Sequence, residues 1–277
     1  MKLTQVFKRP ALHIWGSAFA LLWLGAAAAL QGVAVAPPRF EIVATPGSEV
    51  DKEVAVFARG TGAQRIVPGV FGWTLDPSGR LVLQKPGAGN TAYDASKWVT
   101  ASYDPFTLQP DEPVTIKFSV SIPQDASLQG SYRTALSFTT EPKPGEYKGV
   151  NVLVNTRAVV VVYVTIQGTE KPAAALQGVS LVTAKEGGRK LVADVVNKGN
   201  VYLRLNGELR FVNAKGEVVK RAPLPERVLL REGLVRYELP VPADLPEGVV
   251  LAAIEIQPQG PAKSYGGPPL YAEVALR

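Results

Sequence analysis

The chain of 277 residues contains no cysteine and only one histidine, His13. Without cysteine the protein has no disulfide, no thiol nucleophile and no cysteine-ligated zinc. Because His13 lies in the N-terminal segment described below, the rest of the chain cannot carry a Ser-His-Asp triad, a histidine-ligated metal or a histidine pH switch. These absences exclude several common classes of enzyme and metalloprotein.

Other catalytic and nucleic-acid-binding signals are also absent. The sequence has no glycine-rich phosphate loop, no Gly-x-Ser-x-Gly elbow and no pair of acidic residues in a hydrolase motif. Its 30 basic and 24 acidic residues are spread along the chain without a block of like charge, which argues against nucleic-acid binding. We therefore predict a protein that is not an enzyme and needs no metal or cofactor.

The N-terminus is typical of an export signal. Lys2, Lys8 and Arg9 precede an uncharged apolar run over residues 14–30, and small residues follow. We predict that 1–36 is a signal peptide cleaved after Ala29, Ala34 or Ala36, and the proline that follows Ala36 favours an earlier site. The alternative is an uncleaved signal anchor, because the run is close to the shortest length that spans a bilayer. Either way, we expect the protein in the periplasm or cell envelope.

The remainder of the sequence predicts strands joined by turns. Residues 114–123 alternate between apolar and polar side chains, residues 65–84 read as a hairpin around Asp-Pro-Ser-Gly, and no later segment has a sustained helical period. The 26 glycines and 23 prolines suit many short strands. We predict an all-β protein of two tandem immunoglobulin-like β-sandwiches, over 37–168 and 176–277, joined by a linker at 169–175.

Several motifs resemble those of the periplasmic pilus (fimbrial) chaperones and their two-domain envelope relatives. In the first half these are PPRFEIVATPG, DPFTLQPDEPVTIKFSVSIP, QGSYRTALSFTTEP and NTRAVVVVYV, and in the second half VVNKGNVYLRLNGELRFVNAKGEVV and VPADLPEGVVLAAIEI. The resemblance covers roughly residues 37–275. It implies a binding protein that holds a secreted or pilus subunit by β-strand addition. By the same resemblance, Arg39 and Arg157 hold the carboxylate of the partner, and Val159, Val161 and Tyr163 line the strand that pairs with it.

The stretch NVLVNTRAVVVVYVTI, residues 151–166, has two interpretations. In one, the strand is buried on both faces, which explains why residues 158–164 are all apolar. In the other, Val159, Val161 and Tyr163 lie on an edge that a partner strand covers. If the strand is simply buried, the protein is a structural component of the envelope whose sandwiches act as spacers. In the second half, Tyr202, Arg204 and Asn206 share one face of a strand, which we expect to face solvent.

Overall fold

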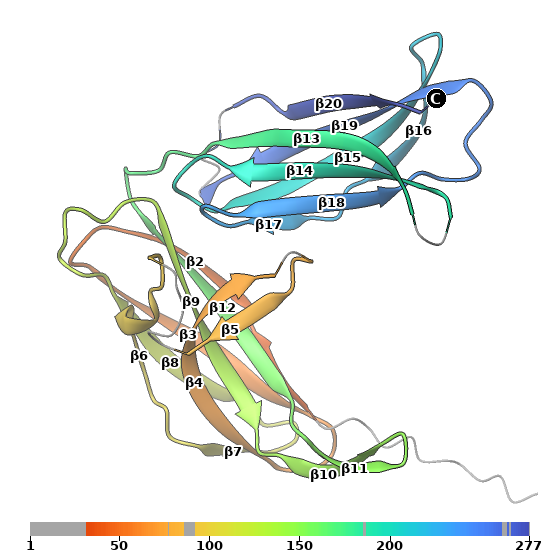
Figure 1. The fold of residues 1–277 in the computed structure, drawn as a ribbon. Coiled ribbons are helices and arrows are strands. Elements are labelled where there is room, and N and C mark those ends of the chain that lie inside the picture. The colour runs from red at the N-terminus through yellow and green to blue at the C-terminus, as the bar shows by residue number, and fades with distance from the viewer. Residues whose placement is uncertain are drawn as a thin grey trace, which may run out of the picture.

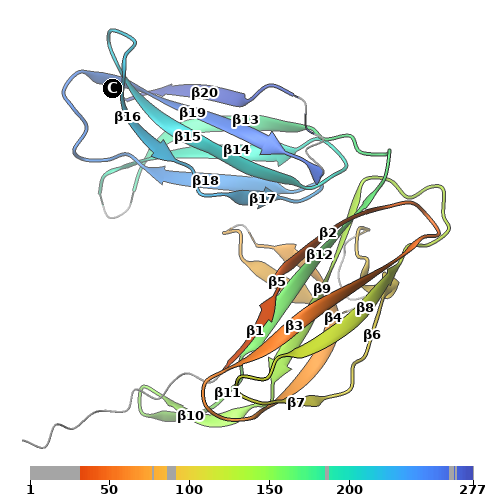
Figure 2. The same cartoon turned by 180° about the vertical axis from the view of Figure 1, so that it is seen from behind.

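The computed structural model describes residues 32–76, 78–85, 92–184, 187–261, 265 and 267–276. Strands are the main element of this chain, and they form two β-sandwiches one above the other (Figures 1 and 2). The prediction of two tandem immunoglobulin-like sandwiches is confirmed. No helix in the described ranges has the length and hydrophobicity needed to cross a bilayer. Most of the predicted signal segment, residues 1–31, lies outside the described residues.

The first sandwich packs two sheets face to face. One has the strand order β1-β3-β8-β6, and the other has the order β2-β12-β9-β4-β5 with β7 paired to β4. The bounds of these strands are β1 Gly32–Ala36, β2 Arg39–Ala44, β3 Glu49–Arg59, β4 Gln64–Leu75, β5 Leu81–Gln84, β6 Val99–Ala101, β7 Phe106–Leu108, β8 Val114–Ser121, β9 Ser131–Thr140 and β12 Arg157–Ile166. A 3-10 turn, Ser96–Trp98, precedes β6. Alternate apolar side chains of both sheets meet in the core, as in the row Val160, Val162 and Val164 of β12.

The second sandwich contains the remaining long strands. A sheet of order β13-β14-β18 packs on a sheet of order β16-β15-β19-β20, to which β17 is added beside β15. The bounds are β13 Ala174–Thr183, β14 Arg189–Asn197, β15 Leu203–Asn213, β16 Val218–Pro223, β17 Arg227–Leu229, β18 Leu234–Pro240, β19 Val249–Gln259 and β20 Leu270–Ala275. Because β13 begins at Ala174, it starts within the segment predicted as a linker.

The stretch 151–166, predicted as one strand, forms two. Val150–Val154 is β11, which pairs only with β10, Lys143–Tyr147, in a separate two-stranded ribbon. Thr156 then turns the chain into β12, since its N–H donates to the Thr140 hydroxyl and its carbonyl accepts from the Thr140 N–H. The one-strand prediction was wrong because a continuous apolar run does not show where a strand changes its partner.

Strand β1 belongs to the first sandwich although it lies inside the segment predicted to be the signal. It pairs along its whole length with β3, and Val33 and Val35 pack against the core. Cleavage after Ala29 would keep this strand, whereas cleavage after Ala34 or Ala36 would remove most or all of it.

We therefore expect a chain that starts at Pro37 to be less stable than one that starts at Leu30. Losing the two half-buried valines of β1 should cost about 2–3 kcal/mol in the free energy of unfolding. Urea denaturation of the two chains would measure this difference. Equal midpoints would show that β1 contributes nothing to the stability of the sandwich.

Candidate binding site between the two sandwiches

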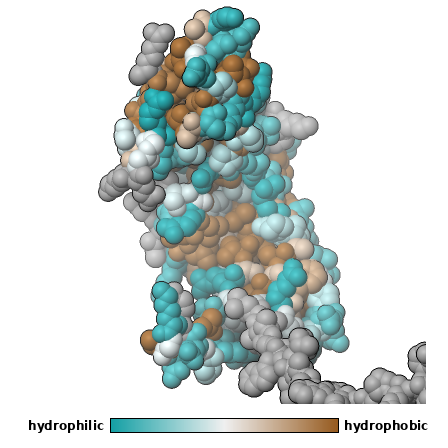
Figure 3. Space-filling view, turned by 90° about the vertical axis from the view of Figure 1, so that its right-hand side faces the viewer, coloured by the Kyte–Doolittle hydropathy of each residue, from teal (hydrophilic) through white to brown (hydrophobic). Residues whose placement is uncertain are grey.

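Strand β12 presents Arg157, Val159, Val161 and Tyr163 on the face opposite the core. Val159 and Val161 are half-buried and join a cluster with Trp73, Ala135 and Tyr163. Tyr163 is only 3% exposed, so its side chain is covered in this structure. The apolar run at 158–164 thus has two causes, since one face fills the core and the other faces the second sandwich. Hydrophobic side chains also form a band across the first sandwich on the face shown in Figure 3.

The structure does not bring the two predicted carboxylate-binding arginines together. Arg39 lies opposite Val161 in the parallel pairing of β2 with β12, and its Nε is 2.9 Å from Oε1 of Glu41. Arg157 lies four residues before Val161, at the start of β12, which is roughly 13 Å away along the strand. Its Nε donates to the Thr139 hydroxyl, and its guanidinium is 5.7 Å from the centre of the Phe71 ring. The joint role of the two arginines stays a prediction.

On one side of β12, no described strand pairs with its first four residues, although β1 lies close to this strand. β9 pairs with β12 from Arg157 onward, but β2 pairs with it only from Val161 onward. The Val161 N–H donates to the Pro38 carbonyl, so the main-chain groups of Arg157 and Val159 point to the same side. There the next donor to β12 would be the N–H of residue 38, which proline lacks. The β2 ladder therefore stops, and no described strand pairs with this edge.

The two sandwiches meet through aromatic rings on the outer face of β12. Tyr202 of the second sandwich lies on Tyr163 with a distance of 4.2 Å between ring centres, and Trp73 meets Tyr163 edge-on at 5.5 Å. The guanidinium of Arg204 bridges Glu41, at 2.8 Å, and Glu226, at 3.1 Å. The expectation that Tyr202 and Arg204 face solvent was therefore wrong, because the first sandwich covers this face.

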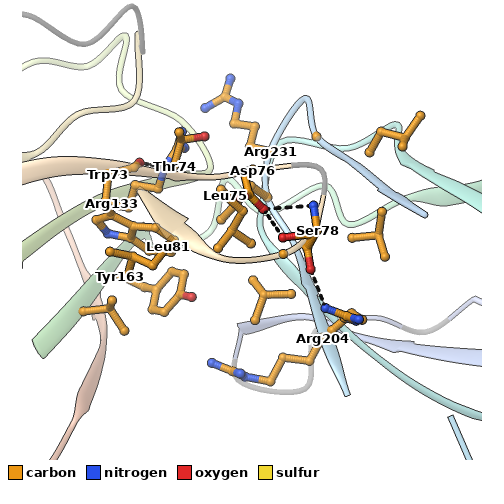
Figure 4. A pocket seen from close by; sticks show the side chains of 18 of the residues that line it. Trp73, Thr74, Leu75, Asp76, Ser78, Leu81, Arg133, Tyr163, Arg204 and Arg231 are labelled. Carbon is orange, nitrogen blue, oxygen red and sulfur yellow. Dashed lines mark hydrogen bonds between the residues drawn. The ribbon is translucent and has the colours of Figure 1, made fainter. Parts of the chain in front are cut away.

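Beside this contact lies a cavity of about 560 Å³ between the sandwiches. The first sandwich contributes β4, β5, β9 and β12 to its walls, and the second contributes the segment from Glu226 to Arg236. Figure 4 shows Trp73, Arg133 and Tyr163 grouped at one side of the cavity. Of the predicted site residues, Arg39, Val161 and Tyr163 line it. No group of three potential metal ligands occurs among the described residues.

Burial sets the electrostatics of the cavity floor. Burial lowers the pKa of Arg133 and raises the pKa of Tyr163 to about 12, so the tyrosine is neutral at physiological pH. At the rim, Arg236 donates two hydrogen bonds of 2.7 Å to the Asp194 carboxylate. These hydrogen bonds hold the pKa of Asp194 below its usual value.

The Arg236–Asp194 pair should make stability depend on pH at the acid end. The folded-state pKa of Asp194 is depressed, so its contribution is present above the unfolded pKa of about 3.9 and is lost as pH falls through the folded value. We expect Asp194→Asn to lower the free energy of unfolding by about 0.5–1 kcal/mol at pH 7 and to have no effect near pH 2. Thermal melts at both pH values would measure this, with Glu53→Gln in an exposed pair as control. A loss that is equal at both pH values would contradict the assignment.

Comparisons with known proteins give matches only among solved structures. No family model matches the sequence, and no curated protein matches it. Among solved structures, the YadV chaperone aligns over 88% of this chain and 99% of its own, with 12% identity and a TM-score of 0.44. The E. coli chaperone DraB aligns over 88% and 98%, with 13% identity and a TM-score of 0.40. The chain resembles pilus chaperones.

A chain from the complex of the Salmonella enterica SafA pilin with the SafB chaperone aligns in the same way. It covers 88% of this chain and 96% of its own, with 10% identity and a TM-score of 0.43.

Proposed function

We propose that this protein is an exported, non-enzymatic binding protein that holds a secreted or pilus subunit by β-strand addition. The observation that carries the proposal is the unpaired edge of β12 at residues 157–160. An extended segment of the partner would pair with residues 157–160 of β12, with which β2 does not pair because Pro38 has no N–H to donate. The proposal involves no metal, cofactor or nucleic acid.

Two kinds of contact support strand addition at this edge. The main-chain groups of Arg157 and Val159 would supply the ladder hydrogen bonds, which any sequence can make. The side chains of Val159 and Val161 would supply specificity, and completing their burial is worth about 2–3 kcal/mol. An open apolar edge is an aggregation hazard for a free protein, so its presence favours a binding role.

The β10–β11 ribbon carries further exposed apolar side chains. It immediately precedes β12 in the chain and carries Val150, Leu153 and Val154 exposed, with Leu153 at 75%. An isolated two-stranded ribbon is only marginally stable in water. Contact of a partner with one face of the ribbon would stabilise it.

The arginines retain their proposed role of holding a carboxylate of the partner. Arg157 has no ion pair with any described residue, and Arg39 shares Glu41 with Arg204. They lie on the same face of the sheet, where Val161 is level with Arg39 and Val159 lies between Val161 and Arg157. Arginine binds a carboxylate through two parallel hydrogen bonds, so both side chains would leave their present contacts and extend over the valines.

A pull-down from envelope extract, with mass spectrometry of the bound proteins, tests the proposal. The wild type should retain a small β-rich secreted protein. Val159→Lys should lose it, because lysine on an open edge opposes strand pairing. Val182→Lys, which changes an exposed valine of the second sandwich, is the matched control. Retention by every variant, or by none including the wild type, would rule out strand addition at this edge.

The role of the arginines is tested in the same experiment by the Arg39→Ala/Arg157→Ala double variant. If Val159→Lys loses the partner and the folded double variant keeps it, the strand edge is correct and the carboxylate role is wrong. If both lose it while Val182→Lys keeps it, both parts of the proposal stand.

A structural spacer is the second candidate, and the contact between the sandwiches favours it. Besides the Arg204 bridge, Arg227 donates to the Ser78 carbonyl at 2.9 Å and Arg231 to the Gln129 carbonyl at 2.7 Å. Contacts of this kind hold two domains at a fixed angle, which suits an assembly module. A wild type that retains no partner would leave this role as the better explanation.

A further inference from the structure

The β10–β11 ribbon carries the two most exposed large apolar side chains of the described chain. These are Leu153 and Val150, both on β11. Val150, Val152 and Val154 point to one face of the ribbon and Leu153 points to the other, because side-chain directions alternate along a strand. A flat protein surface covers only one face of a ribbon. Apolar side chains on both faces therefore favour an environment that surrounds β11.

The two strands of the ribbon differ in polarity. β10 carries Lys143 and Glu146, and Lys148 lies in the turn that leads to β11. Lys148 and Gly149 both have positive φ values, as in a tight two-residue hairpin turn. Charged groups thus lie along β10 and at the turn, whereas β11 is apolar apart from Asn151. The ribbon is therefore amphipathic from one edge to the other.

The ribbon projects from the end of the first sandwich that lies away from the second sandwich, as Figures 1 and 2 show. In the described chain its strands pair only with each other, and no side chain of β11 belongs to the hydrophobic core of either sandwich. A surface that touches the ribbon would leave the second sandwich standing away from it. The apolar side chains of β11 are thus not used by the described fold itself.

The N-terminal part of the chain enters the first sandwich beside the base of the ribbon. Gly32 begins β1, and a Cβ atom on it would lie 3.6 Å from the Thr156 hydroxyl oxygen. Thr156 lies between the end of β11 and the start of β12. The apolar run 14–30 ends two residues before Gly32, which an extended chain spans in at most about 7 Å. A bilayer that holds this run therefore lies close to the base of the ribbon.

We propose that the ribbon docks on the lipid bilayer that holds residues 14–30, with β11 in the interface and β10 at the level of the headgroups. At that depth the valine and leucine side chains leave water, while headgroups and water still reach the main chain of β11. Lys143 and Lys148 face the phosphates of anionic lipids. The inference concerns the chain that keeps residues 1–31, as a signal anchor or before cleavage, and it does not rest on the proposed function.

Site-specific fluorescence on the full chain tests the docking, and the absence of native cysteine makes each label unique. Leu153→Cys and Val182→Cys are labelled with bimane and reconstituted in vesicles of phosphatidylethanolamine with a minor share of phosphatidylglycerol. Lipids that carry a nitroxide near the start of the acyl chain act as quenchers. The Leu153→Cys label should lose at least about half of its fluorescence, because it lies at the depth of the quencher. The Val182→Cys label, on the second sandwich, should keep its fluorescence.

A second label separates docking from mere nearness to the anchor. Asn151→Cys is labelled in the wild-type background and together with Val150→Ser/Leu153→Ser, which removes apolar groups of the ribbon and leaves the anchor intact. Quenching of this label should fall at least about threefold in the serine background, because the ribbon loses the apolar area that it buries in the interface. Val182→Ser/Val218→Ser, which changes two exposed valines of the second sandwich, is the matched control and should leave the quenching unchanged.

The proposal is overturned by any of three results. The first is an unquenched Leu153→Cys label on chain that is bound to the vesicles. The second is equal quenching of the Asn151→Cys label in the wild-type and serine backgrounds, which would assign the signal to the anchor alone. The third is a wild-type dimer in detergent solution that the serine variant dissociates, which would identify a second copy of the chain as the occupant. A failure of the strand-addition test leaves these measurements unaffected, since Val159→Lys changes β12 and not the ribbon.

Discussion

The Trp73→Ala variant should unfold with a free energy about 3–5 kcal/mol below that of the wild type, the usual cost of truncating a buried large aromatic side chain. Trp73 is 2% exposed although it lies on the outer face of its sheet. Its Nε1–H donates to the Thr134 carbonyl at 2.9 Å, and its ring meets Tyr163 edge-on. Alanine would leave a void beneath the second sandwich and an unpaired carbonyl.

Urea denaturation followed by circular dichroism would measure this loss. Tyr103→Ala is the control, because Tyr103 is about half exposed and should contribute less than about 1 kcal/mol. A loss for Trp73→Ala no larger than that of the control would show that the outer face of the sheet is not part of the stable core.

The second large effect is expected at the contact between the sandwiches. Tyr202→Ala should cost about 2–4 kcal/mol of interaction between the two domains, because it removes a fully buried ring stacked on Tyr163. The wild type should then unfold in one transition and the variant in two. Trp73 and Trp98, the only tryptophans after residue 36, both belong to the first sandwich.

Tryptophan fluorescence therefore follows the first sandwich alone, whereas far-ultraviolet circular dichroism follows both. The two signals should give the same midpoint for the wild type and different midpoints for Tyr202→Ala. Tyr271→Ala, which removes an exposed ring of the second sandwich, should behave like the wild type. Coincident signals for Tyr202→Ala would show that the domains are coupled through other contacts.

The fold class could be predicted from the sequence because strand alternation and turn chemistry are local. Residues 114–123 and the Asp-Pro-Ser-Gly turn gave β8 and the β4–β5 hairpin correctly. Which element covers the face of a strand, by contrast, depends on residues that are distant in the sequence. Tyr202 and Arg204 were expected to face solvent because nothing near them in the sequence shows that Tyr202 packs on Tyr163 and that Arg204 pairs with Glu41.

The candidate site shows the same limit. Val159, Val161 and Tyr163 were predicted to line an edge that pairs with a partner, and this stays a prediction. They share one face of β12, and their exposure depends on the docking of the second sandwich. Arg133 was missed, although a signal was present: it is the only charged residue in SYRTALSFTT, whose other positions are small, polar or apolar. A lone arginine within a strand that is buried on both faces lacks the solvent that normally screens it, and this marks it for attention.

Under the strand-addition proposal, the two prolines before β2 determine how many residues of β12 a partner strand can pair with. Moving Pro38 two positions toward the N-terminus would let β2 pair with β12 as far as Val159 and shorten the vacant length. Moving it two positions toward the C-terminus would lengthen the unpaired part of β12 by two residues. Side-chain directions in a strand repeat every two residues, so the same face would be kept. The length and phase of the segment that fits beside Val159 are thus fixed by residues more than a hundred positions earlier in the chain. If the strand-addition proposal holds, substitutions there would change the selectivity for partner strands without altering the surface that those strands touch.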